Sequence, residues 1–494
     1  MSNQSNNLNN LNNSNNLTNF YDASELRTNH HKLKKVFFYR ISGMGMGTTA
    51  TLLREAGYEV AGCDMAFYPP MGDYLKKHQI TCYTMDEITE SILKQFDLIV
   101  VGNSISGKSA EAKLIENCGV PFTSFPCLLG EIVLKDRTVV GIAGTHGKTT
   151  TTYYLTQMLS NLGEDVGYLV GGVLKDRDAS KLGTSKYFVI EADEYESSYF
   201  QKFSKLRLYN IKKLVLAALE FDHADVFKTI AEIEKQFDVI IPNLSGLVVN
   251  SDYEAAQRFT EKVKTLQKIN IFSYGLKSPN GPIDIVTKNG KTTFSIMVNN
   301  AKTAFETNII GPQNILNLAA CIYFCLQEGF AIEKIKKSLE QLHNVKRRQE
   351  LKGTYGKCKV VDDFAHHPTA IELTLESIRQ TYPNQSIHVV FEAVTSTARS
   401  NAFQDEFARV FENVASVLIA NPQIPTNASQ YENLNYSKLA SDINSQGVFS
   451  REYLELESLR KEIDKLAQNE GVLLILSNRT VLGLWESDFV KKIV

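Results

Sequence analysis

The stretch that most constrains the fold is residues 138–152, TVVGIAGTHGKTTTT. Its apolar run, 139–143, is typical of a buried strand, and apolar residues at helical spacing follow the stretch. Between them lies a glycine-rich turn of the kind whose N–H groups, together with the next helix N-terminus, bind phosphate. Its glycines, Gly144 and Gly147, are closer together than in the common G-x-x-x-x-G-K-[ST] pattern. We expect Lys148 to reach the outer phosphates and Thr149 to ligate Mg²⁺; the alternative is a strand-to-helix turn without a ligand.

Length and composition set the class of protein. A chain of 494 residues predicts about three domains. With 43% hydrophobic residues, 22% charged residues and a net charge of −2, the composition does not favour nucleic acid or an anionic membrane surface as a partner. No apolar run approaches the roughly 20 residues of a membrane-spanning helix, so we expect no membrane insertion. The seven cysteines are scattered, which favours free buried thiols in the cytoplasm over zinc ligation.

The first 30 residues are predicted to form a disordered tail, because the Asn-rich start of the chain offers little apolar surface to bury. The first domain, expected over 34–135, then begins with a strand (36–41), a glycine turn (42–47), a helix and a second strand that ends at Asp64. This is the outline of a nucleotide-binding βαβ unit in which Asp64 would contact a ribose. The glycines do not spell G-x-G-x-x-G, so a mononucleotide or sugar-nucleotide site is as open as a dinucleotide site.

The central domain, expected over 136–345, has acidic clusters after two predicted strands, at 191–194 and 220–225. Because the carboxyl ends of parallel strands meet at one edge of a sheet, we expect these clusters beside the phosphate loop, where a magnesium ion would lie. Solvated strand ends are the alternative. Further on, Asn289-Gly290 predicts a hairpin, and Asn314 and Asn317 share one face of a predicted helix.

The third domain, expected over 346–494, alternates strands and helices again and predicts a further parallel α/β unit. The pairs Asp362-Asp363 and His366-His367 fall at the end of its first strand, a position suited to a ligand.

Together these motifs resemble those of the muramate ligase family, the ATP-dependent amide-bond-forming enzymes of peptidoglycan synthesis. The resemblance covers the chain from about residue 35 to its end and is carried by GTHGKTTT (144–151), EADE (191–194), EFDHAD (220–225), N-x-x-N (314–317), KRR (346–348) and DDFAHHPTA (362–370). YPPM (68–71), EFDHADVF and GGV (171–173) look most like the recycling branch of the family. The implied fold is a three-domain α/β architecture with a Rossmann-like first domain, a P-loop ATPase-like central domain and a Rossmann-like third domain.

The resemblance also implies a reaction. ATP, with Mg²⁺, would activate the carboxylate of UDP-N-acetylmuramate as an acyl phosphate, and the amine of L-Ala-γ-D-Glu-meso-diaminopimelate would displace the phosphate. The nearest alternative acceptor is L-alanine. A further alternative is that the protein is a drifted paralogue that binds nucleotide without forming the amide bond. A P-loop kinase, a nicotinamide-dependent dehydrogenase and a non-catalytic UDP-sugar-binding regulator are rivals from other classes, but the kinase and the dehydrogenase account for only parts of the chain.

The family's site residues carry over by position. The implied catalytic residues are Lys148, Glu191 and His223, and the implied metal ligands are Thr149, Glu191 and His223. The implied ATP contacts are Gly144, Thr145, His146, Gly147, Lys148, Thr149, Thr150, Asn314, Asn317, Arg347 and Asp363. The implied substrate contacts are Gly43, Met46, Gly47, Asp64, Tyr68, Asn103, Ser106 and His366.

The chain departs from the family pattern in several places. Arg40 stands where the first loop usually has glycine, and Gly107 replaces an arginine. In the third domain, FEAVT (391–395) replaces FEPRS and SNRTVLG (477–483) replaces SNGGFGG. The ATP and metal residues are nearly complete, whereas the residues expected to meet the incoming peptide are not.

Overall fold

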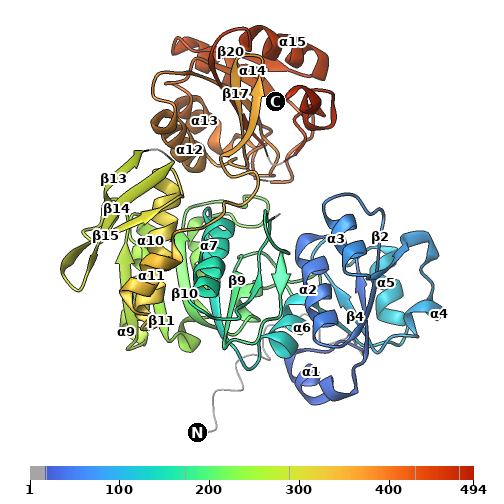
Figure 1. Cartoon of the computed structure of the whole chain (residues 1–494). Coiled ribbons are helices and arrows are strands. Elements are labelled where there is room, and N and C mark those ends of the chain that lie inside the picture. Colours follow the sequence, from blue (N-terminus) through green and yellow to red (C-terminus); the bar gives the residue numbers. More distant parts are fainter. Residues whose placement is uncertain (1–16, 18, 173, 289, 429, 478) are drawn as a thin grey trace. The chain divides into compact units, whose positions relative to one another are not determined.

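The computed structural model describes residues 17, 19–172, 174–288, 290–428, 430–477 and 479–494 (Figure 1). The chain divides into two compact units. The first comprises the residues up to 219 with 233–274 and 320–338, and the second comprises 220–232, 275–319 and 339–494.

The predicted tail is too long. Residues 1–16 and 18 lie outside the described residues, but a short helix, α1 (Ala23–Asn29), falls inside the predicted tail. Phe20 packs against Phe122 and Phe200 with tilted rings, whose centroids lie 6.0 and 5.1 Å away. Leu26 is fully buried, and Arg27 forms an ion pair with Glu131 at 2.7 Å. The apolar side chains that follow the Asn-rich start are therefore enough to hold this segment on the first domain.

The first domain is built on a five-stranded parallel sheet of order β3-β2-β1-β4-β5. Its strands are β1 (Lys35–Tyr39), β2 (Glu59–Asp64), β3 (Thr81–Thr84), β4 (Leu98–Val101) and β5 (Phe122–Ser124). The helices are α2 (Met44–Glu55), α3 (Met71–Lys77), α4 (Glu90–Leu93), α5 (Ala110–Asn117) and α6 (Phe125–Leu128). Helix α2 begins inside the predicted glycine turn, so that turn spans only the few residues before Met44.

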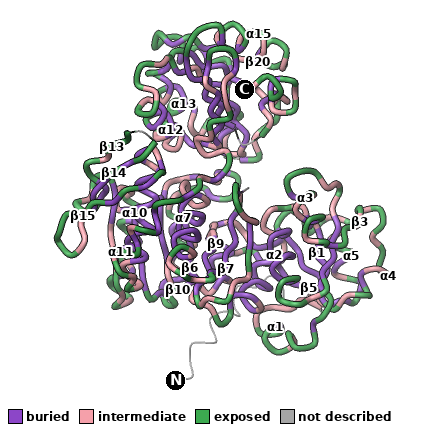
Figure 2. Tube along the Cα trace, in the orientation of Figure 1, coloured by how far each residue is buried: buried purple, intermediate pink, exposed green. Residues whose placement is uncertain are grey.

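The central sheet has seven strands in the order β12-β11-β10-β6-β9-β7-β8, and only β8 runs antiparallel to its neighbour. The strands are β6 (Thr138–Gly144), β7 (Gly167–Leu169), β8 (Ser180–Lys181), β9 (Tyr187–Glu191), β10 (Ile211–Ala218), β11 (Gly246–Asn250) and β12 (Asn270–Tyr274). Helix α7 (Lys148–Asn161) packs on β6 and β9, and α8 (Ile230–Asp238) and α9 (Glu254–Leu266) follow. The middle strands β6, β9 and β10 are almost wholly buried (Figure 2), which explains their continuous apolar runs.

The predicted hairpin is present as β13 (Ile283–Lys288) and β14 (Lys291–Val298), joined in a three-stranded antiparallel sheet by β15 (Ala301–Thr307). Of its turn dipeptide, residue 289 lies outside the described residues, and Gly290 has a φ of 75°, as a tight turn requires. Helix α10 (Pro312–Gln327) follows and contains the predicted helix of Asn314 and Asn317, and α11 (Ile332–Ser338) comes after it.

The third domain is a six-stranded sheet of order β16-β17-β21-β18-β19-β20, parallel except for β16. Its strands are β16 (Glu350–Tyr355), β17 (Cys358–Asp363), β18 (Ser386–Glu392), β19 (Ser416–Ala420), β20 (Phe449–Tyr453) and β21 (Gly471–Leu476). Its helices are α12 (Pro368–Thr381), α13 (Gln404–Val410), α14 (Tyr436–Ser445) and α15 (Leu456–Leu466).

All seven cysteines are free thiols, as predicted. Six are buried, and the exposed Cys82 is the exception to the expectation of burial. Burial raises the pKa of Cys63 and of Cys127 to about 12, so these two thiols stay protonated at neutral pH.

Candidate functional site

The predicted phosphate loop leaves β6 and enters α7. Gly144 and Gly147 have φ values of 136° and 81°, which favour glycine, and helix α7 begins at Lys148. A Cβ on Gly144 would lie 2.5 Å from the carbonyl oxygen of Ala218, so β10 leaves no room for a side chain there. The backbone N–H of Thr145 donates to that same carbonyl at 3.1 Å. The loop is therefore held against the sheet in a conformation that only glycine permits.

Lys148 lies at the N-terminus of α7, where the helix dipole already favours anions. Its ammonium donates to the carbonyl oxygen of Gly144 within the loop itself. A cation held in this way at a helix N-terminus suits a phosphate ligand. On the other side of the loop, the ring Nε2 of His146 lies 3.1 Å from the hydroxyl oxygen of Tyr253.

Thr149 and Glu191 form a pair of hard oxygen ligands next to the loop. The Thr149 hydroxyl donates to the Glu191 carboxylate at 3.1 Å, which leaves the hydroxyl lone pairs free for a cation. The other carboxylate oxygen accepts the N–H of Gly171 at 2.6 Å, so Glu191 is fixed at the end of β9. The described residues contain no group of three or more His, Cys, Asp and Glu side chains placed to hold a metal. Two oxygen ligands still fit Mg²⁺, because this ion keeps several waters and takes further oxygens from nucleotide phosphates.

A cavity of about 730 Å³ lies in the first unit, and Glu191 is one of its lining residues. It is lined by residues of the first domain's glycine turn and strand ends and by residues of the central domain. Of the predicted substrate contacts, Gly43, Met46, Asp64 and Asn103 line it, together with Glu191. The cavity also has lining residues that the sequence analysis did not single out: Arg40, Phe125, Asp193, Lys205 and Tyr209.

Some predicted substrate contacts do not line this cavity. Gly47 is buried, and a Cβ there would lie 2.4 Å from the sulfur of Met71, so its glycine is explained by packing. Tyr68 is 76% exposed, and Ser106 is exposed in the loop before α5. Their roles as substrate contacts stay predictions.

Two basic residues that line the cavity form ion pairs with carboxylates. Arg40, with a φ of 67°, binds Glu111 through two nitrogens and lies 3.5 Å from Asp64. Lys205 lies 3.0 Å from Asp193, and its ammonium faces the rings of Phe125 and Tyr195. The Asp64 carboxylate also accepts the backbone N–H of Ser42, so the predicted ribose ligand is fixed in the turn.

His223 and His366 belong to the second unit, where they surround Asp222. The Asp222 carboxylate accepts the backbone N–H of His223 at 2.7 Å, and His223 has a φ of 57°. Burial raises the pKa of Asp222, but the neighbouring His223, His367 and His366 outweigh it and lower the pKa to about 2. Burial lowers the pKa of His366 to about 4 despite the charge of Asp222, so its imidazole is neutral at pH 7. The cluster therefore holds the neutral imidazole of His366 beside the ionised carboxylate of Asp222.

The predicted ATP contacts Asn314 and Asn317 lie on one face of α10 and are buried, with 6% and 3% of their surface exposed. The Asn314 side chain donates to the carbonyl of Ile310 at 2.9 Å. This bond is a local contact at the start of the helix, and the contacts of the two asparagines with ATP stay predictions.

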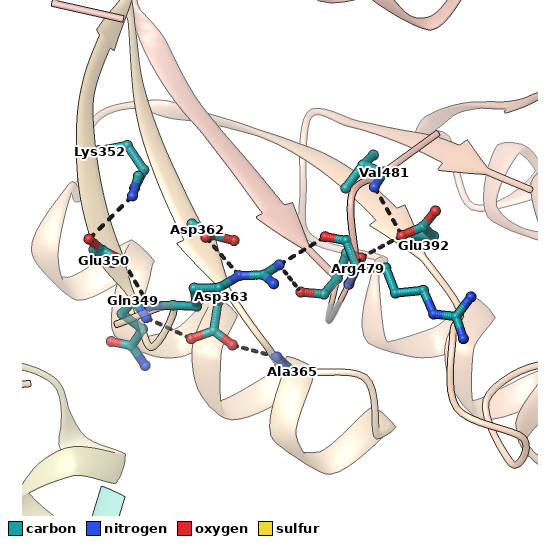
Figure 3. A network of polar contacts seen from close by, with 11 residues as sticks. Gln349, Glu350, Lys352, Asp362, Asp363, Ala365, Glu392, Arg479 and Val481 are labelled. Atoms are coloured by element: carbon teal, nitrogen blue, oxygen red, sulfur yellow. Dashed lines mark hydrogen bonds and ion pairs between the residues drawn. The ribbon is translucent and has the colours of Figure 1, made fainter. Parts of the chain in front are cut away.

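The predicted ATP contact Asp363 belongs to a polar network in the third domain (Figure 3). The other predicted ATP contact of this domain, Arg347, takes part in the same network through Asp362. Arg347 binds Asp362 at 3.0 Å and donates to the carbonyls of Ser477 and Arg479 at 2.8 and 3.1 Å. Asp363 accepts the N–H groups of Gln349 and Ala365 at 2.8 and 2.7 Å. Burial raises the pKa of Asp362 to about 6, against the lowering effect of Arg347. In this structure the guanidinium of Arg347 therefore organises the loop after β21.

A phosphate loop with an oxygen pair for Mg²⁺, next to a cavity of about 730 Å³ lined by both charged and apolar residues, defines the site of a nucleotide-using enzyme. The comparisons with known proteins then identify the family. Residues 35–137 match the catalytic domain of the Mur ligase family, 142–325 its middle domain and 347–479 its glutamate ligase domain. The chain belongs to the Mur ligase family, whose members are ATP-dependent ligases that form amide bonds in peptidoglycan synthesis.

Two kinds of relative are similar to this chain. The UDP-N-acetylmuramate–L-alanyl-γ-D-glutamyl-meso-2,6-diaminoheptandioate ligase of Haemophilus influenzae is 33% identical over 79% of this chain and 86% of its own length. The UDP-N-acetylmuramate–L-alanine ligase of Acetivibrio thermocellus is 34% identical over 79% of this chain and 82% of its own length. Sequence identity alone therefore does not separate the two acceptors.

Solved structures agree with the fold. A murein peptide ligase from Psychrobacter arcticus is similar over 92% of this chain and 97% of its own, with a TM-score of 0.66 and 26% identity. The UDP-N-acetylmuramate-alanine ligase of Thermotoga maritima has a TM-score of 0.74 over 93% of this chain and 98% of its own at 19% identity. The predicted three-domain muramate-ligase fold is confirmed; the domain boundaries stay predictions. No described helix is long and apolar enough to cross a membrane.

Proposed function

We propose that the protein joins UDP-N-acetylmuramate to the peptide L-Ala-γ-D-Glu-meso-diaminopimelate, consuming ATP, in peptidoglycan recycling. The observation that carries this proposal is the position of Glu191. This side chain accepts a hydrogen bond from Thr149 in the phosphate loop, and Glu191 also lines the cavity to which Gly43, Asp64 and Asn103 contribute. A sugar nucleotide in the cavity would thus present its carboxylate next to the γ-phosphate of ATP in the loop.

The chemistry would proceed in two displacements. The lactyl carboxylate attacks the γ-phosphorus, the bond to the bridging oxygen breaks, and ADP leaves with an acyl phosphate formed. The peptide amine then attacks the acyl carbon, inorganic phosphate leaves, and the nitrogen loses a proton. Positioning and charge neutralisation supply most of the catalysis in phosphoryl transfer, and Lys148 and the helix α7 N-terminus are placed to supply both. Mg²⁺, held by Thr149 and Glu191, would neutralise phosphate charge.

We propose the peptide rather than L-alanine as acceptor because the segments YPPM (68–71) and GGV (171–173) resemble the recycling branch of the family. Two relatives named as ligases of that peptide are 33% and 31% identical to this chain over 79% and 78% of its length, which supports this choice. The L-alanine ligase is the second candidate, supported by a relative of equal identity. The use of ATP and a nucleotide sugar as substrates supports the expected cytoplasmic location. His223, Asn314, Asn317 and Arg347 keep their proposed roles toward metal and ATP.

The test is phosphate release from ATP with UDP-N-acetylmuramate, comparing L-alanine with the tripeptide. Release stimulated by the tripeptide supports the proposal, and release stimulated by L-alanine alone assigns the other ligase activity. Lys148→Ala should abolish release, whereas Lys181→Ala, which removes an exposed lysine paired with Asp165, should not. Nucleotide binding without release for either acceptor would favour a paralogue that no longer ligates.

A further inference from the structure

A second pocket lies in the first unit, next to the cavity that Glu191 lines. Its volume is about 230 Å³, which is room for roughly eight water molecules. Met44 lines both the cavity and the pocket, and the consecutive residues Gly171 and Gly172 line one each. The apolar walls of the pocket come from the start of α3 and from the segment before β8, and they include Pro70, Met71, Leu174 and Ala179. The pocket is therefore formed where the segment YPPM meets the described glycines of GGV.

Hydroxyl groups hold the two sides of this pocket together. The phenol oxygen of Tyr74, on α3, lies 2.9 Å from the hydroxyl of Ser180, the first residue of β8. The Thr51 hydroxyl, on α2, lies 3.0 Å from that of Ser180 and 3.1 Å from that of Tyr74. Lys77, also on α3, forms an ion pair with Asp178 of the segment before β8. The walls are thus fixed before a ligand arrives, which lowers the entropic cost of binding.

Two opposite charges line the pocket without pairing with each other. Asp73, exposed in the first turn of α3, has a side chain that forms no hydrogen bond or ion pair within the described part of the chain. Arg177 is held by Asp176, whose carboxylate accepts Nε at 3.0 Å and lies 2.9 Å from Nη2, and its guanidinium lies 5.9 Å from the ring centre of Tyr153. Its third nitrogen, Nη1, has no partner among the described residues. The pocket therefore offers one carboxylate and one guanidinium nitrogen to a ligand that carries both signs of charge.

We propose that this pocket binds the free amino-acid end of the acceptor's meso-diaminopimelate, with its ammonium at Asp73 and its carboxylate at Arg177. The methylene chain that leads to this end matches the apolar walls of Met71, Leu174 and Ala179. A guanidinium matches the planar geometry of a carboxylate, and charge-assisted contacts are stronger than neutral ones. The inference rests on the proposed function, because that reaction brings this peptide to the enzyme.

The pocket also lies where the far end of the peptide must be held. The amine that reacts belongs to the opposite end of the peptide and would meet the sugar carboxylate in the cavity that Glu191 lines. Three extended residues span on the order of 10 Å, so the diaminopimelate end stays close to that cavity. A pocket that shares Met44 with the cavity is within this distance.

The first arm of the test compares two acceptors in the full-length enzyme: the meso-diaminopimelate tripeptide and L-Ala-γ-D-Glu-L-Lys, which lacks only the distal carboxylate. The wild type should prefer the diaminopimelate peptide by about tenfold or more in kcat/KM, the size expected for one charge-assisted contact. Arg177→Gln should lower kcat/KM for that peptide by about the same factor and change it for the lysine peptide by less than about twofold. Lys175→Gln is the control, because Lys175 is an exposed residue of the same segment that does not line the pocket, and it should behave like the wild type.

The second arm uses Asp73→Asn to remove the other charge. Both tripeptides carry the distal ammonium, so kcat/KM should fall for both, by roughly threefold to tenfold because Asp73 is exposed. The dipeptide L-Ala-γ-D-Glu lacks the whole distal group and should react equally with the variant and the wild type. The KM values for ATP and UDP-N-acetylmuramate should stay unchanged in both variants, which also shows that each variant is folded.

Equal losses with the two tripeptides in Arg177→Gln would assign Arg177 a purely structural role and overturn the inference. A raised KM for UDP-N-acetylmuramate in either variant would assign the pocket to the nucleotide sugar and overturn it as well. If the wild type shows no tripeptide-dependent phosphate release, the proposed function falls and this inference falls with it. If the wild type uses both tripeptides equally well, or Arg177→Gln matches Lys175→Gln, only this inference falls.

Discussion

Replacing Gly144 by alanine perturbs the phosphate loop at the point where it leaves β6. The new methyl group would lie 2.5 Å from the carbonyl oxygen and 2.6 Å from the nitrogen of Ala218, both backbone atoms of β10. For the new methyl group to reach an ordinary contact distance of about 3.4 Å from the Ala218 oxygen, the loop or the strand must move by about 0.9 Å. The hydrogen bond from Thr145 to the same carbonyl would have to lengthen with it. We expect the phosphate loop to move, and the buried strand β10 to keep its position.

The expected size of the effect follows from this displacement. A misplacement of about 1 Å in a catalytic site can cost roughly 100-fold in rate, so kcat/KM for ATP should fall by about that factor. The free energy of unfolding should fall by about 1–2 kcal/mol for the left-handed conformation and by about 1–3 kcal/mol more for the overpacked contact.

Gly163, near the other end of α7, offers a matched control. It also has a positive φ, 97°, but an added Cβ would meet nothing within 4 Å. Gly163→Ala should therefore show only the conformational cost and keep full activity. The assays are coupled phosphate release, nucleotide binding by calorimetry and urea unfolding. A folded Gly144→Ala enzyme with kcat/KM for ATP within about twofold of the wild type would refute the reasoning.

Three further predictions follow from the same contacts. Glu191→Gln should raise the Mg²⁺ concentration needed for half-maximal rate by at least about tenfold, because an amide lacks the negative charge that favours the cation. An unchanged Mg²⁺ dependence would exclude Glu191 as a ligand. The His366 imidazole should remain neutral down to about pH 5 in an NMR titration, because burial lowers its pKa to about 4. In the unfolded chain the same imidazole takes up its proton near pH 6.5, so burying it neutral stabilises the fold fully only above that pH. The free energy of unfolding should fall as the pH drops from 6.5 toward 4, by about 2 kcal/mol at pH 5. A titration of His366 near pH 6.5 in the folded protein would contradict this. Glu392→Gln should lower the free energy of unfolding, measured by urea unfolding, by about 1.5–3 kcal/mol. The new amide nitrogen would face one of the groups that now donate a hydrogen bond to the carboxylate, the Ser477 hydroxyl or the Val481 N–H. An unchanged unfolding midpoint would show that the loop after β21 does not depend on this charge.

The local elements and the phosphate loop followed from the sequence because their causes are local. An apolar run, a glycine turn and helical spacing determine β6, the loop and α7 with little help from the rest of the chain. The glycine turn before α2 was less well predicted: Gly45 and Gly47 are helical, and Gly47 is required by the close approach of Met71, a contact that no local pattern reveals. The tail was predicted too long for the same reason, since Phe20 is held by Phe122 and Phe200 from distant segments.

What the sequence by itself determined is the family, the strand–loop–helix that carries Lys148 and Thr149, and the acidic residues at the strand ends, because residue type and spacing along the chain are enough for these. What only the tertiary structure decided is which of these groups meet. It pairs Thr149 with Glu191 across 42 positions of sequence, adds Arg40 and Lys205 to the cavity, and brings Asp73 and Arg177 to the walls of one pocket. The physical reason is that such encounters depend on strand order and on burial, which arise only when the whole chain packs.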